Sequence, residues 1–319
     1  MNCLSWNCRG LGNQGTVQEL ARLVREKDPS VVFLSKTWMD DHRIELLRCR
    51  FLFSNKFVVK RINKGGGLVL FWKHDVNLTI KSYSLSHIDT VIDGSLAFPW
   101  RLTCFYGAPE THLLENSWNF LRTLKSQYSL PWCCTGDFNE IVHCSESIGR
   151  CSRNDRQMQG FRNVIDDCEF LDLGYRGLPF TWCNNRRGEA TTWLRLDRFI
   201  ATNEWLMHFH FAVVYHLECT ESDHKPIWLT MAPMQSQRPK PKLFRFEEMW
   251  RTEVGCEENI TKAWVLKVRG SLMVQVQDMI HRCGKDLTAW SRVHFGSVTQ
   301  NIRKKKDELK RAEEQSILS

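Results

Sequence analysis

The stretch that most constrains the fold is an apolar run that ends in a glycine and two closely spaced polar residues. This stretch, PWCCTGDFNE at residues 131–140, begins as a buried strand and reaches a turn at Gly136. In extended backbone, residues two apart point to the same side, so Asp137 and Asn139 should face one way and Phe138 the other. A carboxylate and a carboxamide held at a strand end can position and polarise a water molecule. Taken alone, the same residues also fit a polar turn that only closes a core strand.

The composition indicates a folded protein that works in a reducing compartment. The chain has 319 residues, 42% of them apolar, and 13 tryptophans, which argues against disorder. The 13 cysteines form no CxxC pair and no zinc-type spacing with histidine, and most lie in apolar runs. We therefore expect free thiols and a location in the cytosol or the nucleus. No stretch is long and apolar enough for a membrane span, and the N-terminus has no signal-peptide pattern, so we expect no membrane partner.

Apolar runs and amphipathic runs alternate through the first 232 residues. The glycines at 65–67 are followed by no Gly-Lys-Ser/Thr motif, so they predict a turn between strands and not a phosphate-binding loop. Many strands with a few intervening helices predict an α+β fold, a four-layered α/β/β/α sandwich of two packed mixed sheets flanked by helices. The predicted strands are 3–6, 31–34, 68–72, 76–83, 101–106, 131–136, 180–182, 193–200, 211–216 and 227–231, and the predicted helices are 16–28, 113–128 and 157–171.

The amino-acid composition of the chain changes near residue 232. Residues 233–243 are polar and carry several prolines, which predicts a linker. Residues 244–319 have helical spacing and predict a helical C-terminal extension. Residues 235–319 hold 17 basic and 11 acidic side chains, whereas residues 1–234 hold 27 and 25, so most of the net charge of +8 lies in the extension.

Polar clusters stand at the ends of several other predicted strands. A single such cluster is more simply a satisfied turn, but several in one domain indicate a functional site. Besides Asp137 and Asn139, the clusters contain Asn7, Lys36, Tyr106, Asp197 and the pair Asp223-His224.

Six of these stretches together resemble the motifs of the endonuclease/exonuclease/phosphatase superfamily. They are, in chain order, SWNCRGL (5–11), LSKTW (34–38), FYGAP (105–109), GDFNE (136–140), RLDRF (195–199) and SDHKP (222–226). With FTWCN at 180–184, they are most similar to the apurinic-like endonuclease domain of plant non-LTR (LINE-type) retrotransposons. The resemblance covers residues 1 to about 232. Residues 244–319 look like the helical connector that precedes a reverse transcriptase in such elements, and no reverse transcriptase is present in this sequence.

The resemblance implies hydrolysis of a phosphodiester bond in DNA, with Mg²⁺ or Mn²⁺ as the cofactor and no small-molecule cofactor. It implies that Asp137 activates a water that Asn139 orients, and that His224, oriented by Asp197, contacts the phosphate. It further implies phosphate donation by Tyr106, a metal neighbourhood formed by Asn7 and Asp223, and substrate contacts from Asn184 and Arg9. No feature of the sequence indicates an oligomeric state.

One position departs from the family pattern. The family reads Leu-Ser-Glu-Thr-Trp, with the glutamate as the main metal ligand, where this chain has Lys36. An ammonium group cannot ligate Mg²⁺, and the change from −1 to +1 opposes a cation at the same place. We therefore expect weakened metal binding and an impaired DNA-nicking enzyme. Two alternatives stay open: an inactive relic that binds DNA, and a phosphatase on the same fold.

Overall fold

The computed structural model describes all residues except 61–65, 94–97, 150–152, 187, 232–243, 245, 266–271, 297 and 319. The chain divides into two compact units, Met1–Gln235 and Ser236–Ser319. The linker predicted at residues 233–243 lies outside the described residues. Within the part of the chain that is described, no helix combines the length and the apolar character needed to cross a bilayer.

The first unit contains two six-stranded sheets. The first sheet has the strand order β14–β15–β1–β2–β4–β3, and the second has the order β10–β13–β8–β7–β6–β5. The strands of the first sheet are β1 (Asn2–Asn7), β2 (Val31–Ser35), β3 (Asn55–Val59), β4 (Leu68–Trp72), β14 (Val213–His216) and β15 (Ile227–Thr230). Those of the second are β5 (Leu78–Ser84), β6 (His87–Asp93), β7 (Pro99–Tyr106), β8 (Trp132–Asp137), β10 (Phe170–Asp172) and β13 (Asp197–Thr202).

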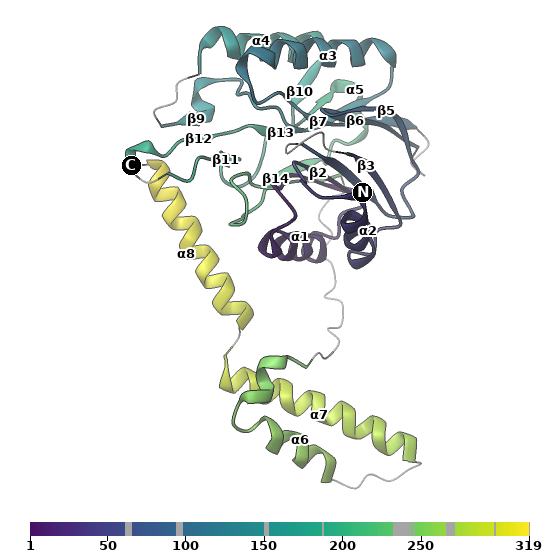
Figure 1. The fold of residues 1–319 in the computed structure, drawn as a ribbon, viewed down its shortest axis with the longest axis vertical. Helices are drawn as coiled ribbons and strands as arrows, with labels where there is room; N and C mark the ends of the chain where they lie inside the picture. The colour runs from purple at the N-terminus through teal and green to yellow at the C-terminus, as the bar shows by residue number, and fades with distance from the viewer. Residues whose placement is uncertain are drawn as a thin grey trace. The chain divides into compact units, whose positions relative to one another are not determined.

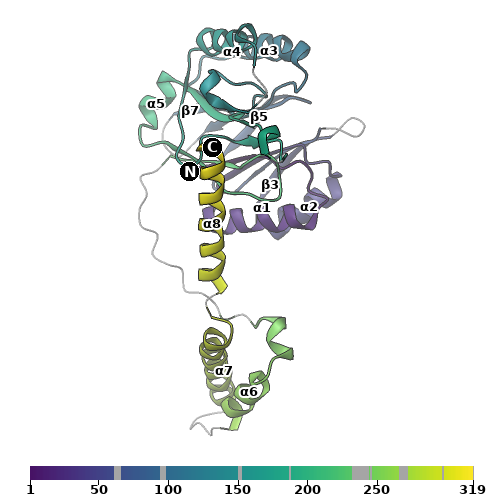
Figure 2. The same ribbon diagram turned by 90° about the vertical axis from the view of Figure 1, so that its left-hand side faces the viewer.

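The two sheets pack face to face and helices cover their outer faces (Figures 1 and 2). The helices α1 (Gln14–Lys27) and α2 (Asp41–Arg50) lie outside the first sheet, and α3 (Leu114–Gln127) and α4 (Asp155–Asp167) lie outside the second. This confirms the predicted four-layered α/β/β/α sandwich. A short helix α5 (Asn203–His208), a small sheet of β9 (Ser147–Ile148), β11 (Trp182–Cys183) and β12 (Trp193–Leu194), and 3-10 turns complete the unit.

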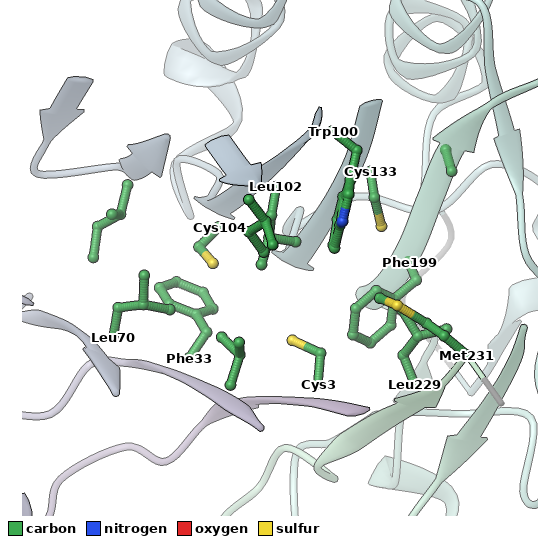
Figure 3. Close-up of a cluster of buried hydrophobic side chains, with 14 of the residues drawn as sticks. Cys3, Phe33, Leu70, Trp100, Leu102, Cys104, Cys133, Phe199, Leu229 and Met231 are labelled. Atoms are coloured by element: carbon green, nitrogen blue, oxygen red, sulfur yellow. The ribbon is translucent and has the colours of Figure 1, made fainter. Parts of the chain in front are cut away.

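The core between the sheets is built from side chains of both inner faces (Figure 3). Phe33 and Leu70 project from the first sheet, and Leu102 and Phe199 project from the second; all four are fully buried. Each such side chain contributes about 1.5–3 kcal/mol by leaving water. Three free thiols, those of Cys3, Cys104 and Cys133, are buried in the same layer.

Each sheet has one pair of parallel strands at its centre. Strand β1 pairs in parallel with β2, and β7 pairs in parallel with β8. Parallel neighbours end at the same edge of a sheet, so their carboxyl ends lie next to each other. Four of the polar clusters predicted from the sequence, those of Asn7, Lys36, Tyr106 and Asp137, lie at the ends of these strands, whereas Asp197 begins β13 and His224 precedes β15.

The strand and helix predictions differ from the structure in several places: β3, β9 and α5 were not predicted, the strand predicted at 193–200 is divided into β12 and β13, and three further differences have a clear physical reason. The helix predicted at 157–171 ends at Asp167, because Glu169 turns into the left-handed region (φ 57°) and Phe170–Asp172 pair as strand β10. Helix α2 was not predicted, since only Ile44 and Leu47 are buried and the apolar stripe is too short to detect. Strand β6 was not predicted either, because its central Asp89 breaks the apolar pattern, and in the fold this aspartate is fully buried in an ion pair with Arg101.

The second unit is helical. Its described elements are a 3-10 turn at Glu248–Thr252, α6 (Cys256–Val265), α7 (Leu272–His294) and α8 (Val298–Leu318). Trp250, Cys256 and Leu287 are buried together and hold α6 against α7. A helical C-terminal extension is therefore present, as expected.

We expect the first unit to fold without the second. A protein that ends at Gln235 retains both sheets, their four covering helices and the whole core between them. Its thermal unfolding, followed by far- and near-ultraviolet circular dichroism, should be one cooperative transition with tryptophan signals of a packed core. Broad, non-cooperative unfolding of this fragment would contradict the division.

Candidate active site

The candidate site lies where the two sheets present their strand ends to each other. Asn7 is the last residue of β1 and is aligned with Ser35 at the end of β2. Tyr106 ends β7 and is aligned with Asp137 at the end of β8, and Asp137 is aligned on its other side with Asp197, the first residue of β13. Residues from five strands thus meet at one edge of the sandwich.

Asp137 is the centre of the cluster. Its side chain is only 1% exposed, so each of its oxygens needs a partner. Asn7 Nδ2 donates to Asp137 Oδ2 at 2.8 Å, and the backbone N–H of Asn139 donates to Oδ1 at 2.9 Å. The first bond crosses from one sheet to the other and the second fixes the carboxylate from its own loop. The orientation of this carboxylate is therefore set by both sheets.

The backbone around Asp137 requires the residue types that the sequence has there. Gly136 has φ 143°, and a Cβ at this position would overlap the carbonyl of Phe105 on the neighbouring strand. Asn139 adopts the left-handed region (φ 56°), which asparagine tolerates better than most residues, and its Nδ2 donates to the carbonyl of Gly107 at 2.8 Å. The motif thus turns sharply after β8 while the carboxylate stays aimed into the site.

His224 and Asp197 form a buried pair next to Asp137. His224 Nδ1 and Asp197 Oδ2 are 2.8 Å apart, and His224 Nε2 lies 3.7 Å from Asp137 Oδ2. Both members are buried, with 3% and 2% exposure. Trp6 Nε1 donates to the carbonyl of His224 at 3.0 Å, and the backbone N–H of His224 donates to the Ser222 hydroxyl at 3.1 Å. The orientation of His224 is therefore fixed by contacts to its ring and by contacts to its backbone.

The charges of this pair follow from its surroundings. Burial lowers the pKa of His224, but the carboxylates of Asp197 and Asp137 act more strongly in sum and raise the pKa to about 9. Burial raises the pKa of Asp197 to about 6, against the opposing effect of the His224 imidazolium. Between these values the pair is an imidazolium and a carboxylate. His224 then presents Nε2–H as a donor toward the centre of the site.

Tyr106 and Lys36 lie together at the open side of the cluster. The Tyr106 hydroxyl is buried without a hydrogen-bond partner among the described residues, and burial raises the pKa of this phenol well above its usual range. It therefore stays protonated and available as a donor. Lys36 Nζ lies 5.1 Å from the centroid of the Tyr106 ring. The lysine that occupies the family's glutamate position thus faces the site.

Asp223, predicted to belong to a metal neighbourhood, is held by two donors. Its Oδ2 accepts from Arg9 Nη1 in an ion pair and from Trp182 Nε1 at 3.0 Å. Arg9, Trp182 and Asp223 also line an open cavity of about 760 Å³ next to the cluster, together with Arg153 and Arg186. The cavity therefore combines three guanidinium groups with one indole ring.

Some of the predicted residues lie apart from the cluster. Asn184 lines the cavity, but its side chain is used within its own loop, where Nδ2 donates to the carbonyl of Ala190 and Oδ1 accepts from the N–H of Arg186 and of Thr192. In the motif at 195–199 only Asp197 faces the site. The flanking Arg195 and Arg198 are buried in ion pairs with Glu146 and Asp172.

Two residues of the site were not predicted from the sequence. Thr181 is fully buried, and its hydroxyl accepts from the N–H groups of Leu196 and Asp197 at 2.9 Å each, which fixes the start of β13. Trp182 reaches Asp223 as described above, and its backbone forms a bridge with His224. Both belong to the stretch at 180–184, which was predicted as a strand at 180–182 and noted as part of the family resemblance. A Thr-Trp pair at a predicted strand end is the signal that could have marked them.

The side chains at the site do not fit a divalent metal ion. Among the described residues, Asp137, Asp197 and His224 form the one group whose ligand atoms lie within 4.8 Å of one another. Within that group Asp197 holds His224, and a protonated imidazole is not a ligand. Asn7 Oδ1 and Asp223 Oδ1 are buried without partners and could face a hard cation, but Arg9 neutralises Asp223. Lys36 adds a further positive charge. Mg²⁺ completes its octahedral shell largely with water but needs one or two carboxylate ligands, and here Asp197 and Asp223 are already paired with cations of the chain.

Comparison with known proteins places this arrangement in one family. A family model with the description Endonuclease/Exonuclease/phosphatase family matches residues 4–224, which is well over half of the chain. No curated protein matches the chain.

Several solved structures have the same fold at low sequence identity. The endonuclease domain of TRAS1, a telomere-specific non-LTR retrotransposon, has a TM-score of 0.53 and 15% identity, with 73% of this chain and 99% of that chain covered. An AP endonuclease from Archaeoglobus fulgidus has a TM-score of 0.55 and 14% identity, with coverage of 72% and 98%. A 3′ phosphatase, NExo, from Neisseria, bound to a product DNA hairpin, has a TM-score of 0.53 and 15% identity, with coverage of 72% and 98%.

The raised pKa of His224 predicts a pH-dependent stability. The folded state keeps a proton on His224 up to about pH 9, whereas the unfolded chain loses it near pH 6.5. The stabilisation is fully present below pH 6.5 and is lost as the pH rises through 9. The free energy of unfolding by urea should therefore fall by up to roughly 3 kcal/mol across this window.

The variant His224→Gln should remove most of this pH dependence. His216→Gln is the matched control, because His216 is also buried and hydrogen-bonded but burial lowers its pKa to about 4, so it stays neutral across the window. If both variants keep the slope, the imidazolium–carboxylate pair is not present in solution.

Proposed function

We propose a function from one premise: the chain belongs to the Endonuclease/Exonuclease/phosphatase family. Its fold and the likeness to nucleases and phosphatases support phosphodiester hydrolysis as the general chemistry. The finer function that we propose is nicking of DNA by the endonuclease domain of a plant LINE-type retrotransposon. In this chain Lys36 reduces the rate of that reaction.

The observation that carries the proposal is that a base, Asp137, and a hydrogen-bond donor, His224, face each other across a short distance. The Asp137 carboxylate is fixed by Asn7 and Asn139, and the Nε2–H of His224 points at it from 3.7 Å. In our proposal Asp137 takes a proton from a water that attacks phosphorus, and the bond from phosphorus to one sugar oxygen breaks. His224 and Tyr106 donate to the phosphate oxygens, where negative charge increases in the transition state.

Two features support DNA as the substrate. The cavity beside the cluster offers guanidinium groups from Arg9, Arg153 and Arg186 for phosphates and the Trp182 ring for a base or sugar. Among the structures of similar fold, the TRAS1 domain is named as a retrotransposon endonuclease and NExo is described as bound to product DNA.

Lys36 also supports a second candidate function. A site that binds DNA but does not cut it would keep the fold, the cavity and the donors, and would lack only the metal ligand. This inactive DNA-binding protein differs from the proposed enzyme in turnover alone. A phosphatase for small phosphate esters is the third candidate, and nothing in the described cavity favours it over DNA.

We expect a supercoiled-plasmid assay to separate these candidates. The natural chain should nick DNA slowly or not at all in Mg²⁺, whereas Lys36→Glu should raise the Mg²⁺-dependent rate at least about 100-fold, equivalent to about 2.7 kcal/mol. Adding Asp137→Asn to Lys36→Glu should abolish the gain, since the water then lacks its base. Release of phosphate from inositol phosphates should stay at background for all three proteins.

Fast Mg²⁺-dependent nicking by the natural chain would show that Lys36 does not impair the site. A folded Lys36→Glu variant that stays inactive in both Mg²⁺ and Mn²⁺ would contradict the assignment of Lys36 as the single defect.

DNA binding should depend on salt mainly through the C-terminal unit. Residues 235–319 carry a net charge of +6 and residues 1–234 carry +2. Phosphate contacts release counterions, so deleting residues 236–319 should flatten the slope of log affinity against log salt concentration. Fluorescence anisotropy with a labelled duplex between 50 and about 300 mM salt measures this slope. An unchanged slope would assign the phosphate contacts to the first unit.

A further inference from the structure

Lys36 has a partly buried side chain with no carboxylate partner among the described residues. The side chain makes no ion pair and no hydrogen bond with those residues, and Nζ lies 5.1 Å from the centroid of the Tyr106 ring. A cation that is partly removed from water commonly has a counter-charge or hydrogen bonds. Lys36 has neither within the described part of the chain.

The loop that carries Lys36 is built to hold that position. Lys36 lies in the left-handed backbone region (φ 52°), which costs a residue with a Cβ about 1 kcal/mol. The two residues after it are anchored, since Thr37 N–H donates to the carbonyl of Gly67 at 3.2 Å and Trp38 N–H donates to that of Gly66 at 3.4 Å. The carbonyl of Thr37 accepts from the N–H of Leu11 at 2.9 Å. Before Lys36, the carbonyl of Ser35 accepts from the N–H of Cys8 at 3.2 Å, so the backbone that carries the ammonium is fixed on both sides.

The acidic residues of the site already have cations of the chain as partners. Asp223 pairs with Arg9, and Asp197 pairs with His224, whose other ring nitrogen faces Asp137. With these groups and Lys36 ionised, three negative charges face three positive charges. A divalent cation would leave this balanced set with an excess of +2, and in the family arrangement a glutamate would offset it. The charge count therefore opposes a divalent cation, and the position of Lys36 beside Tyr106, without an ion pair to a described carboxylate, is what favours an anion there.

Three donors lie near one another at this edge of the sandwich. Lys36 Nζ stands over the ring of Tyr106, the Tyr106 hydroxyl is buried with no acceptor, and His224 Nε2 points into the same cluster. Tyr106 and His224 both neighbour Asp137, which ties the three donors to one point of the fold. Phosphate oxygens accept from donors of all three kinds.

We propose that Lys36, Tyr106 and His224 form a binding site for a phosphate group that needs no metal ion. The ligand is a phosphate of the DNA backbone or free phosphate, which share the oxygen atoms that these donors recognise. The inference rests on the proposed function in its choice of a phosphate ligand, but it concerns binding and not hydrolysis. Lys36 then supplies a positive charge for binding in place of Mg²⁺, but it does not supply the Lewis acidity of Mg²⁺.

The test measures binding in EDTA, where no metal-dependent turnover takes place. Calorimetry with inorganic phosphate at constant ionic strength should detect one site on the full chain, and adding Mg²⁺ should change the affinity less than twofold. Lys36→Glu and the uncharged Lys36→Met should each weaken binding at least about tenfold, and Tyr106→Phe should weaken it by a smaller factor. Lys81→Glu is the matched control, because Lys81 is exposed on β5 and this variant changes the net charge equally.

The competition arm identifies the source of the phosphate. If inorganic phosphate displaces a labelled duplex in EDTA, the site holds a DNA phosphate; if it binds without displacing DNA, the site serves a free phosphate group. Both results support the proposal. Binding that requires Mg²⁺, or equal effects of Lys36→Glu and Lys81→Glu in proteins with native circular dichroism, would overturn it.

This outcome is separable from that of the proposed function. If the natural chain binds phosphate without a metal and Lys36→Glu never nicks DNA, the phosphate site is supported and the endonuclease proposal fails. If Lys36→Glu nicks DNA and the natural chain binds no phosphate, the endonuclease proposal is supported and the phosphate site fails.

Discussion

The hydrogen bond between Asn7 and Asp137 joins the two halves of this fold at the place where chemistry can occur. Asn7 ends a central strand of one sheet and Asp137 ends a central strand of the other. Neither strand could orient the carboxylate alone, since one supplies the acid and the other supplies its donor. The apolar layer between the sheets keeps these ends at hydrogen-bonding distance, and His224, Asp197 and Tyr106 are arranged around the same carboxylate. The geometry of the site is therefore a consequence of how the sheets pack.

Charge at this edge is balanced within the chain itself. The left-handed residues Arg9 and Lys36 bring two cations to a place where carboxylates would otherwise dominate. In our proposal, the ammonium of Lys36 at the position of the family's glutamate shifts the ligand that the site favours from a metal ion toward an oxyanion, while the strands and the other donors stay as they are.

The sequence indicated which polar residues lie together at the strand ends better than it indicated the elements that support them. Residues at strand ends, such as Asp137 and His224, could be found because polar residues there interrupt an apolar pattern. Pairings between distant loops could not, and the partners of Asp223, which are Arg9 and Trp182, depend on loops that approach only after both sheets have packed. Asn184 is a case in which the residue type suggested a role that the fold does not support. An asparagine could contact a phosphate, but the amide of Asn184 is hydrogen-bonded to backbone groups of its own loop. Strand β6 was missed because it contains Asp89, a residue type common in turns, whose buried ion pair with Arg101 cannot be seen in the sequence.

The free cysteines between the sheets have a consequence for how the molecule can be observed. Cys3, Cys104 and Cys133 are fully buried, and burial raises the pKa of Cys3 to about 12 and that of the other two well above the usual range. Thiol reagents attack the thiolate, so these side chains react only when the sheets separate. The same separation breaks the contact between Asn7 and Asp137. The rate of alkylation at these three cysteines, followed separately from that of the exposed Cys49 and Cys144, therefore reports how often the molecule opens and loses its site.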